Sequence, residues 1–313
     1  MPIQKQRRPI VTKLLNVLLW LNGSRKIYDS VRLSNWLIDS MGVVNALPYR
    51  VPRLLSKGWE KTIVADTVCF IKNGTAKHTI FFLHGGGYTT RPTLFHFIMM
   101  DEIHKLTGAT IMFPLYPLAP NDNYRTCYQR VTLIYQETAF LAKDHCLTLM
   151  GDSAGGGLAL GLYLHLVEQG MTLPSRLVLV APWLDITMKN PGIKAIERYD
   201  HMLGPIGLIE FGKRWADGDD RDQYRLSPIN GNLSSIEKMM IIVGTRDILF
   251  ADAKLLNEKL LALGTQVEFI IGNKMPHDYP LMPIPEARKA VRAITDFITL
   301  GSCVINGDKT ASL

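Results

Sequence analysis

Short apolar runs alternate with helix-like segments along most of this 313-residue chain, from residue 62 onward. Three of the runs, Ile80–Leu83, Leu177–Val180 and Met240–Val243, are apolar at every position. Strands that are covered on both faces have this composition. Strands that are separated by helices imply parallel β-α-β units. The pattern therefore predicts an α/β fold with a doubly wound, mostly parallel sheet.

The expected elements can be assigned from these runs. The strands are expected at Thr62–Ile71, Thr79–Leu83, Ala109–Phe113, Cys146–Met150, Arg176–Val180, Met239–Val243 and Val267–Ile271. The helices are expected at about 93–107, 124–143, 154–169, 204–216, 251–263 and 285–299. Residues 1–50 have helical patterning without strands, and residues 185–230 interrupt the rhythm with prolines and glycines. We therefore expect a core at 51–313 and a helical cap made of the N-terminal segment 1–50 and the inserted segment 185–230.

A serine lies between two glycines in the stretch Gly151-Asp152-Ser153-Ala154-Gly155. The stretch follows an expected strand and precedes an expected helix, which is the context of a nucleophile elbow. The turn strains the serine backbone, and a Cβ two residues before or after it would crowd the neighbouring chain. A Gly-x-Ser-x-Gly match also arises in ordinary turns, so its interpretation depends on the partners of Ser153.

Two polar residues follow strands at the same expected edge of the sheet. His277 follows the strand Val267–Ile271, and Asp247 follows Met239–Val243. Ligands of open parallel sheets bind beyond the carboxyl ends of the strands. A serine nucleophile needs a base within hydrogen-bond reach and a carboxylate that orients the base. We therefore predict Ser153 as nucleophile, His277 as base and Asp247 as orienting acid.

The choice of acid leaves alternatives. Asp247 could instead cap the helix that is expected to begin near residue 251. Asp252 lies five positions further on, and we expect it to face outward from the first turn of that helix, where a carboxylate is favourable. Asp185 follows another strand and could reach the edge of the site. We rank Asp247 first, Asp252 second and Asp185 third.

Three consecutive glycines follow the strand Thr79–Leu83, in His84-Gly85-Gly86-Gly87. Without side chains, their N–H groups can approach a developing negative charge. We predict an oxyanion hole made by the N–H groups of Gly85, Gly86 and Ala154. The spacing matches neither a P-loop nor a dinucleotide fingerprint, which disfavours a phosphate cradle. We expect His84 to support this loop rather than to act as base.

Several motifs together resemble the hormone-sensitive-lipase group of α/β-hydrolase esterases over roughly residues 60–300. They are His84-Gly85-Gly86-Gly87-Tyr88, Tyr116-Pro117-Leu118-Ala119-Pro120, Gly151-Asp152-Ser153-Ala154-Gly155-Gly156-Gly157, Gly244-Thr245-Arg246-Asp247-Ile248-Leu249 and His277-Asp278-Tyr279. The resemblance implies an α/β-hydrolase fold with a helical cap, and the triad and oxyanion donors already named. The chain departs from that group's pattern at Pro117, Asn121 and Ile248, where the group usually carries Arg, Glu and Pro.

The predicted activity is hydrolysis of short-chain acyl esters through an acyl-enzyme intermediate, without a metal or an organic cofactor. The expected partner is a small-molecule ester. Amide or formamide hydrolysis and acyl transfer on the same triad remain alternatives, as does a non-catalytic ligand-binding protein. The base His277 is present, which favours catalysis over the last alternative.

Composition argues against several other functions and sites. The net charge is +7 without a dense Lys/Arg block, which disfavours nucleic-acid binding. The four cysteines, Cys69, Cys127, Cys146 and Cys303, show no CxxC spacing, so a zinc site has no support. Cys69 and Cys146 lie in apolar runs and are expected to be buried. This cysteine usage suits a reducing cytoplasm.

The N-terminal segment has charged residues followed by an apolar run, as in a signal peptide. Lys13 and Asn16 interrupt the run, no small-x-small cleavage site follows, and the run is too short to span a bilayer. We expect an amphipathic helix that covers an apolar surface, with contact to a membrane surface as the alternative. A homodimer also remains open.

Overall fold

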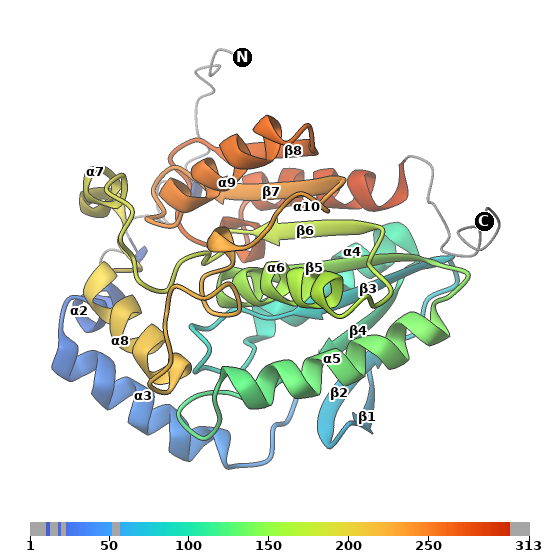
Figure 1. The fold of residues 1–313 in the computed structure, drawn as a ribbon, viewed down its shortest axis with the longest axis horizontal. Helices are drawn as coiled ribbons and strands as arrows, with labels where there is room; N and C mark the ends of the chain where they lie inside the picture. The colour runs from blue at the N-terminus through green and yellow to red at the C-terminus, as the bar shows by residue number, and fades with distance from the viewer. Residues whose placement is uncertain (1–10, 13–17, 20–22, 52–56, 301–313) are drawn as a thin grey trace.

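The structure, a computed structural model, describes residues 11–12, 18–19, 23–51 and 57–300. Within these residues eight strands form one sheet in the order β1-β2-β4-β3-β5-β6-β7-β8 (Figure 1). β2 is antiparallel to both β1 and β4, and every other neighbouring pair is parallel. The strands are β1 (Glu60–Val64), β2 (Thr67–Lys72), β3 (His78–Leu83), β4 (Thr110–Pro114), β5 (Cys146–Asp152), β6 (Arg176–Val180), β7 (Lys238–Gly244) and β8 (Gln266–Gly272).

Helices cover both faces of the sheet, as the alternating pattern predicts. The helices are α2 (Ser24–Tyr28), α3 (Val31–Asn45), α4 (Leu94–Thr107), α5 (Tyr124–Leu141), α6 (Ser153–Glu168), α7 (Ile193–Ile196), α8 (Pro205–Ala216), α9 (Phe250–Ala262) and α10 (Pro285–Thr299). Short 3-10 helices occur at Glu197–Tyr199, Pro228–Asn230 and Tyr279–Leu281. Side chains of α5, α6 and α9 share one buried cluster, and those of α4 and α10 share the other.

The central strands contribute side chains to both buried clusters. In β3, Phe81 and Leu83 belong to the cluster under α5 and α6, whereas Ile80 and Phe82 belong to the cluster under α4 and α10. Successive side chains of a strand point to opposite faces, so a strand buried on both sides must be apolar at every position. The uniformly apolar runs therefore have the cause that was inferred from the sequence.

The structure has two strands where the sequence predicted a single one. The run Thr62–Ile71 forms the hairpin β1–β2, which pairs Val64 with Thr67. Its two turn residues, Ala65 and Asp66, have positive φ of 46° and 55°. Two consecutive residues with positive φ make the tight turn that joins antiparallel strands, and this turn normally contains Gly or Asn. The prediction was wrong because Ala65 gives no such signal. The other expected strands and helices are confirmed, with ends that differ by at most two residues.

The helices α2 and α3 of the N-terminal segment and α8 of the inserted segment lie together, on the side toward which the parallel strands point (Figure 1). Both α2 and α3 pack against α8. Arg25 of α2 joins the two segments, because its Nη1 donates to the carbonyls of Glu197, Asp200 and Leu203 at 3.0, 3.1 and 2.7 Å. Lys13 and Asn16 lie outside the described residues. No helix in the described part of the chain is long and apolar enough to cross a membrane.

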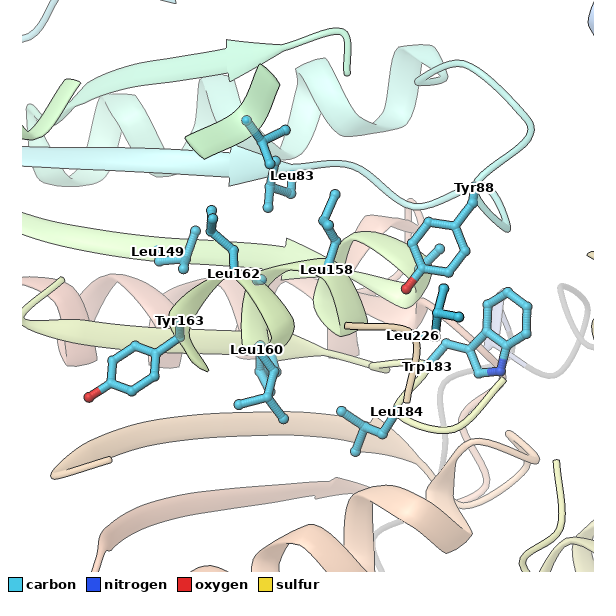
Figure 2. Close-up of a cluster of buried hydrophobic side chains, with 14 of the residues drawn as sticks. Leu83, Tyr88, Leu149, Leu158, Leu160, Leu162, Tyr163, Trp183, Leu184 and Leu226 are labelled. Atoms are coloured by element: carbon cyan, nitrogen blue, oxygen red, sulfur yellow. The ribbon is translucent and has the colours of Figure 1, made fainter. Parts of the chain in front are cut away.

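The helix α6 is packed on the sheet through its whole length. Figure 2 shows Leu158 and Leu162 of α6 beside Leu149 of β5, with Tyr88 and Trp183 beyond the carboxyl end of the strand. The rings of Tyr88 and Trp183 are stacked, with centroids 5.4 Å apart. This packing fixes the position of the turn between β5 and α6. Cys69 and Cys146 are both buried, as expected.

Candidate active site

The turn between β5 and α6 has the geometry of a nucleophile elbow. β5 ends at Asp152, α6 begins at Ser153, and Ser153 has a φ of 51°, in the left-handed region. A Cβ on Gly151 would lie 2.2 Å from the Gly155 carbonyl oxygen, and a Cβ on Gly155 would lie 2.1 Å from the Leu83 oxygen. Real Cβ atoms do not approach backbone so closely, so both positions require glycine. The steric reason inferred from the sequence therefore holds on both sides of the serine.

The structure brings Ser153, His277 and Asp247 together. His277 Nε2 lies 2.9 Å from Ser153 Oγ, and His277 Nδ1 lies 2.8 Å from Asp247 Oδ2. The other oxygen of Asp247 accepts the Leu249 N–H at 2.9 Å, which fixes the carboxylate. All three side chains follow the carboxyl ends of parallel strands, β5, β7 and β8.

The site is shielded from water and strongly charged. Ser153 is 8% exposed and His277 is 5% exposed. Burial lowers the pKa of His277, but the charges of Asp247 and Asp278 outweigh burial and hold that pKa well above its ordinary value. An ionised carboxylate at hydrogen-bond distance stabilises the imidazolium in this way. The arrangement therefore favours the positive charge that a base acquires when it takes a proton.

The glycine loop after β3 lies against the elbow. A Cβ on Gly85 would lie 2.9 Å from the Ser153 Cβ, so the loop backbone approaches the serine closely. Among the described residues, neither Gly85 nor Gly86 donates its N–H to an acceptor within the protein. The Ala154 N–H lies in the first turn of α6, where amides have no acceptor in the helix. The Gly85 backbone and the Ala154 N–H therefore both lie next to the serine.

His84 lies behind this loop. Its Nδ1 is 2.7 Å from the Gly85 carbonyl oxygen, and its ring stacks on Tyr116 with centroids 4.4 Å apart. Burial lowers the pKa of His84 to about 3, so the ring stays neutral. These contacts agree with the expectation that His84 supports the loop.

The two alternative acids have other partners. Asp252 was expected to face outward, and this was wrong: it is 1% exposed, and its Oδ1 accepts from Asn190 Nδ2 at 2.7 Å. The inserted segment covers the start of α9, which residue spacing alone does not reveal. Asp185 Oδ1 accepts from Thr187 and Ser227. No contact joins either carboxylate to His277 in the described part of the chain.

Two further carboxylates belong to the site although sequence reasoning missed them. Asp278 Oδ2 lies 3.1 Å from His277 Nε2. Asp200, from the inserted segment, accepts the N–H of Ile248, the residue after Asp247, at 2.9 Å. Asp278 follows the predicted base directly, which was an available signal. Asp200 lies far from every motif, so the sequence offered no signal for it.

A second His–Asp pair is buried next to the nucleophile. His96 of α4 accepts the Thr93 N–H at its Nδ1, at 2.9 Å, so its Nε2 carries the proton that faces Asp152 Oδ2 at 3.2 Å. Burial lowers the pKa of His96, but the charge and hydrogen bond of Asp152, together with the charge of Asp278 and the contact with Thr93, outweigh burial and leave that pKa raised. This pair holds Asp152, which directly precedes Ser153, in place. Within the described residues no group of three or more His, Cys, Asp or Glu side chains could hold a metal ion.

The chain is similar to a protein family and to several curated hydrolases. A family model described as alpha/beta hydrolase fold matches residues 80–281. An esterase of Acinetobacter venetianus is 28% identical over 229 residues, which are 72% of this chain and 76% of the relative. An acetyl-hydrolase of Streptomyces hygroscopicus is 27% identical over 228 residues, 70% of this chain and 75% of that protein.

A solved structure extends the similarity to nearly the whole chain. A hormone-sensitive lipase from a metagenome library superimposes with a TM-score of 0.78 at 27% identity, covering 92% of this chain and 97% of that chain. The resemblance inferred from the glycine-loop and elbow motifs is therefore confirmed. The family model covers more than half of the 313 residues, including the glycine loop, the elbow and His277. The chain belongs to the alpha/beta hydrolase fold family.

Proposed function

We propose that this chain is a serine carboxylic ester hydrolase that acts on short-chain acyl esters through a Ser-His-Asp triad and an acyl-enzyme intermediate. The observation that carries the proposal is the pair of contacts at His277, 2.9 Å to Ser153 Oγ and 2.8 Å to Asp247 Oδ2. The esterase and acetyl-hydrolase relatives support the ester chemistry.

Acylation begins with Ser153. As its Oγ attacks the ester carbonyl carbon, the hydroxyl proton passes to His277 Nε2. Asp247 keeps the Nδ1 proton in place and stabilises the imidazolium that forms. His277 then gives its Nε2 proton to the leaving alcohol, and the acyl group remains on Ser153.

The negative charge of the tetrahedral intermediate falls on the former carbonyl oxygen. The N–H groups of Gly85, Gly86 and Ala154 are the donors proposed for it. One such donor contributes about 3 kcal/mol to the transition state. Water then attacks the acyl-enzyme while His277 acts as base again, and the carboxylic acid leaves.

The proposed preference for short acyl chains has two supports. The acetyl-hydrolase of Streptomyces hygroscopicus is named for the smallest common acyl group. The nucleophile is also only 8% exposed. A buried nucleophile favours substrates that fit beneath a cover over those that lie in a bulk lipid surface.

The test combines labelling with turnover. A fluorophosphonate probe is expected to label the folded protein, and S153A is expected to abolish both labelling and hydrolysis of p-nitrophenyl acetate. Turnover is expected to fall along the acetate, butyrate, octanoate and palmitate esters. Equal or faster turnover of a matched acetanilide would instead indicate an amidase. Ligand binding without labelling at Ser153 would indicate a non-catalytic binding protein.

A further inference from the structure

Asp278 faces the same ring nitrogen as the proposed nucleophile. Its Oδ2 lies 3.1 Å from His277 Nε2, and Ser153 Oγ lies 2.9 Å from that atom. Asp247 occupies the other ring nitrogen at 2.8 Å. The imidazole is therefore held between two carboxylates, and Nε2 has two neighbours for a single hydrogen.

The side chain of Asp278 is committed to this contact. Its φ is 50°, in the left-handed region, which Asp, Asn and Gly accept more readily than other residues. Its Oδ1 is buried and has no hydrogen-bond partner among the described residues. In the same part of the chain, the ion pair with His277 is the one polar contact of this carboxylate. The side chain is 17% exposed, and this one polar contact is directed at the histidine.

We propose that Asp278 is a second carboxylate of the catalytic histidine, which retains a proton on His277 Nε2 in the resting enzyme and so sets the pH at which Ser153 is activated. The proposal rests on the function proposed for Ser153, His277 and Asp247. An ionised Asp278 accepts a hydrogen bond from the Nε2–H of the imidazolium. Ser153 can transfer its proton only after Nε2 has released that proton to solvent.

The surrounding charges agree with this role. Burial raises the pKa of Asp278 to about 6, although the positive charge of His277 opposes this, so the carboxyl is ionised in neutral solution. Removing its charge takes away one of the two carboxylates that hold the His277 pKa well above its ordinary value. The pKa of His277 must then fall, and the acid limb of the activity profile must move to lower pH.

Other titratable groups face this pair from neighbouring elements. They are Tyr28 of α2, His96 of α4, Asp152 at the end of β5 and Asp247 after β7, whereas Asp200 of the inserted segment interacts with Asp247. Burial raises the pKa of Tyr28, so its hydroxyl stays neutral over the range in question. Burial raises the pKa of Asp200 to about 6, but its Oδ2 is bonded to the Ile248 N–H rather than to Nε2.

The test is the pH dependence of kcat/KM with p-nitrophenyl acetate for the wild type, D278N and D278G. Asn and Gly both accept the left-handed backbone, and both remove the charge. The acid limb is expected to move down by about one pH unit or more in both variants, as removal of a neighbouring opposite charge requires. At a pH below the wild-type limb, kcat/KM is therefore expected to rise about tenfold.

The matched control is D66N. Asp66 is also left-handed, with a φ of 55°, but its side chain is 82% exposed and pairs with Arg130. The profile of D66N is expected to coincide with that of the wild type. A wild-type acid limb in both D278N and D278G would overturn the proposal.

A direct titration of the imidazole keeps the inference separate from turnover and from the folding of the variants. In the wild-type protein, the NMR signals of His277 are expected to titrate well above the ordinary histidine range. A His277 that titrates at or below about 6.5 would overturn the inference even if neither variant folds. Absence of Ser153 labelling at every pH would instead overturn the proposed function, whatever the imidazole titration gives.

Discussion

Asp200 accepts a hydrogen bond from the Ile248 N–H at 2.9 Å, although the two residues are 48 positions apart. Its other oxygen accepts the N–H groups of Met202 and Leu203, at 2.8 and 2.9 Å. Because Ile248 directly follows Asp247, this one buried carboxylate ties the inserted segment to the loop that carries the proposed acid. Burial, with the charge of Asp247 adding to it, raises the pKa of Asp200 to about 6.

Replacing Asp200 is expected to impair turnover through Asp247. In D200A the Ile248 N–H loses its acceptor, so the acid loop can shift, and a misplacement of about 1 Å can lower a rate about 100-fold. We expect kcat to fall by about tenfold to 100-fold with little change in KM. D200N retains one acceptor oxygen and should lose less. Steady-state kinetics with p-nitrophenyl acetate measures both parameters.

The matched control for Asp200 is Asp185, a buried carboxylate of the same inserted segment that accepts the Thr187 N–H and does not touch the acid loop. D185N is expected to keep the wild-type kcat. A D200A enzyme with unchanged kcat and raised KM would mean that Asp200 shapes the substrate site rather than the acid loop.

The assignment of Asp247 predicts a large effect of a small change. D247N keeps the shape of the side chain but favours the wrong imidazole tautomer and removes the charge that stabilises the imidazolium. We expect kcat to fall by about 10⁴-fold, as at other serine triads. Single-turnover labelling with a fluorophosphonate should slow in parallel. An active D247N beside an inactive D185N would reverse the assignment.

The elbow predicts a purely steric loss of stability. In G155A the new Cβ would lie 2.1 Å from the Leu83 oxygen and 2.4 Å from the His84 oxygen. The backbone atoms of Leu83 and His84 cannot move away without disturbing the sheet. We therefore expect a loss of at least about 3 kcal/mol in the free energy of unfolding, measured by urea denaturation. G170A is the control, because Gly170 has a φ of +62° but open space around its Cβ position. Its loss should be near the ordinary cost of the left-handed backbone, about 1 kcal/mol.

Asp252 predicts a pH-dependent stability. Burial raises its pKa from 3.8 to about 6, so the folded state binds a proton more tightly than the unfolded state. The free energy of unfolding therefore falls as pH rises from 3.8 to about 6, and the whole loss is present above about pH 6. We expect D252N to gain about 2 kcal/mol over the wild type at pH 8 and much less near pH 4. Urea denaturation at both pH values tests this, and kcat should be unchanged.

A gain for D252N that is the same at pH 4 and pH 8 would contradict the argument from ionisation. It would mean that the amide packs or bonds better than the carboxyl, for example to Asn190. An Asp66→Asn change provides the exposed comparison, because the Asp66 side chain is 82% exposed and should show no such dependence.

The parts of the site that follow from local chemistry were predictable. The elbow at Ser153 and the glycine loop at Gly85 and Gly86 impose their conformation through backbone sterics that short motifs encode. His277 and Asp247 follow strand ends, and the winding of a parallel sheet brings such ends to one edge. The positions of these residues directly after expected strands were therefore enough to predict that they lie close together.

The parts that depend on packing between distant segments were not predictable. Asp252 occupies the first turn of a helix, where a solvated carboxylate is the ordinary expectation, and only the covering inserted segment makes it buried. Asp200 reaches Ile248 across 48 positions, and no spacing rule links them. The β1–β2 turn was missed for a local reason, since Ala65 adopts a positive φ that its residue type does not signal.

The guanidinium of Arg25 has a consequence for protein engineering. Its contacts with the carbonyls of Glu197, Asp200 and Leu203 hold the N-terminal helix α2 to the inserted segment 185–230, which lies far away in the sequence. If the region 185–230 were replaced by the corresponding region of a relative, the carbonyl groups that Arg25 binds would lie at different positions. Chimeras that also exchange residues 24–45, which form α2 and α3, should keep the packing of these helices against the inserted segment. Chimeras that exchange only the region 185–230 should lose this packing.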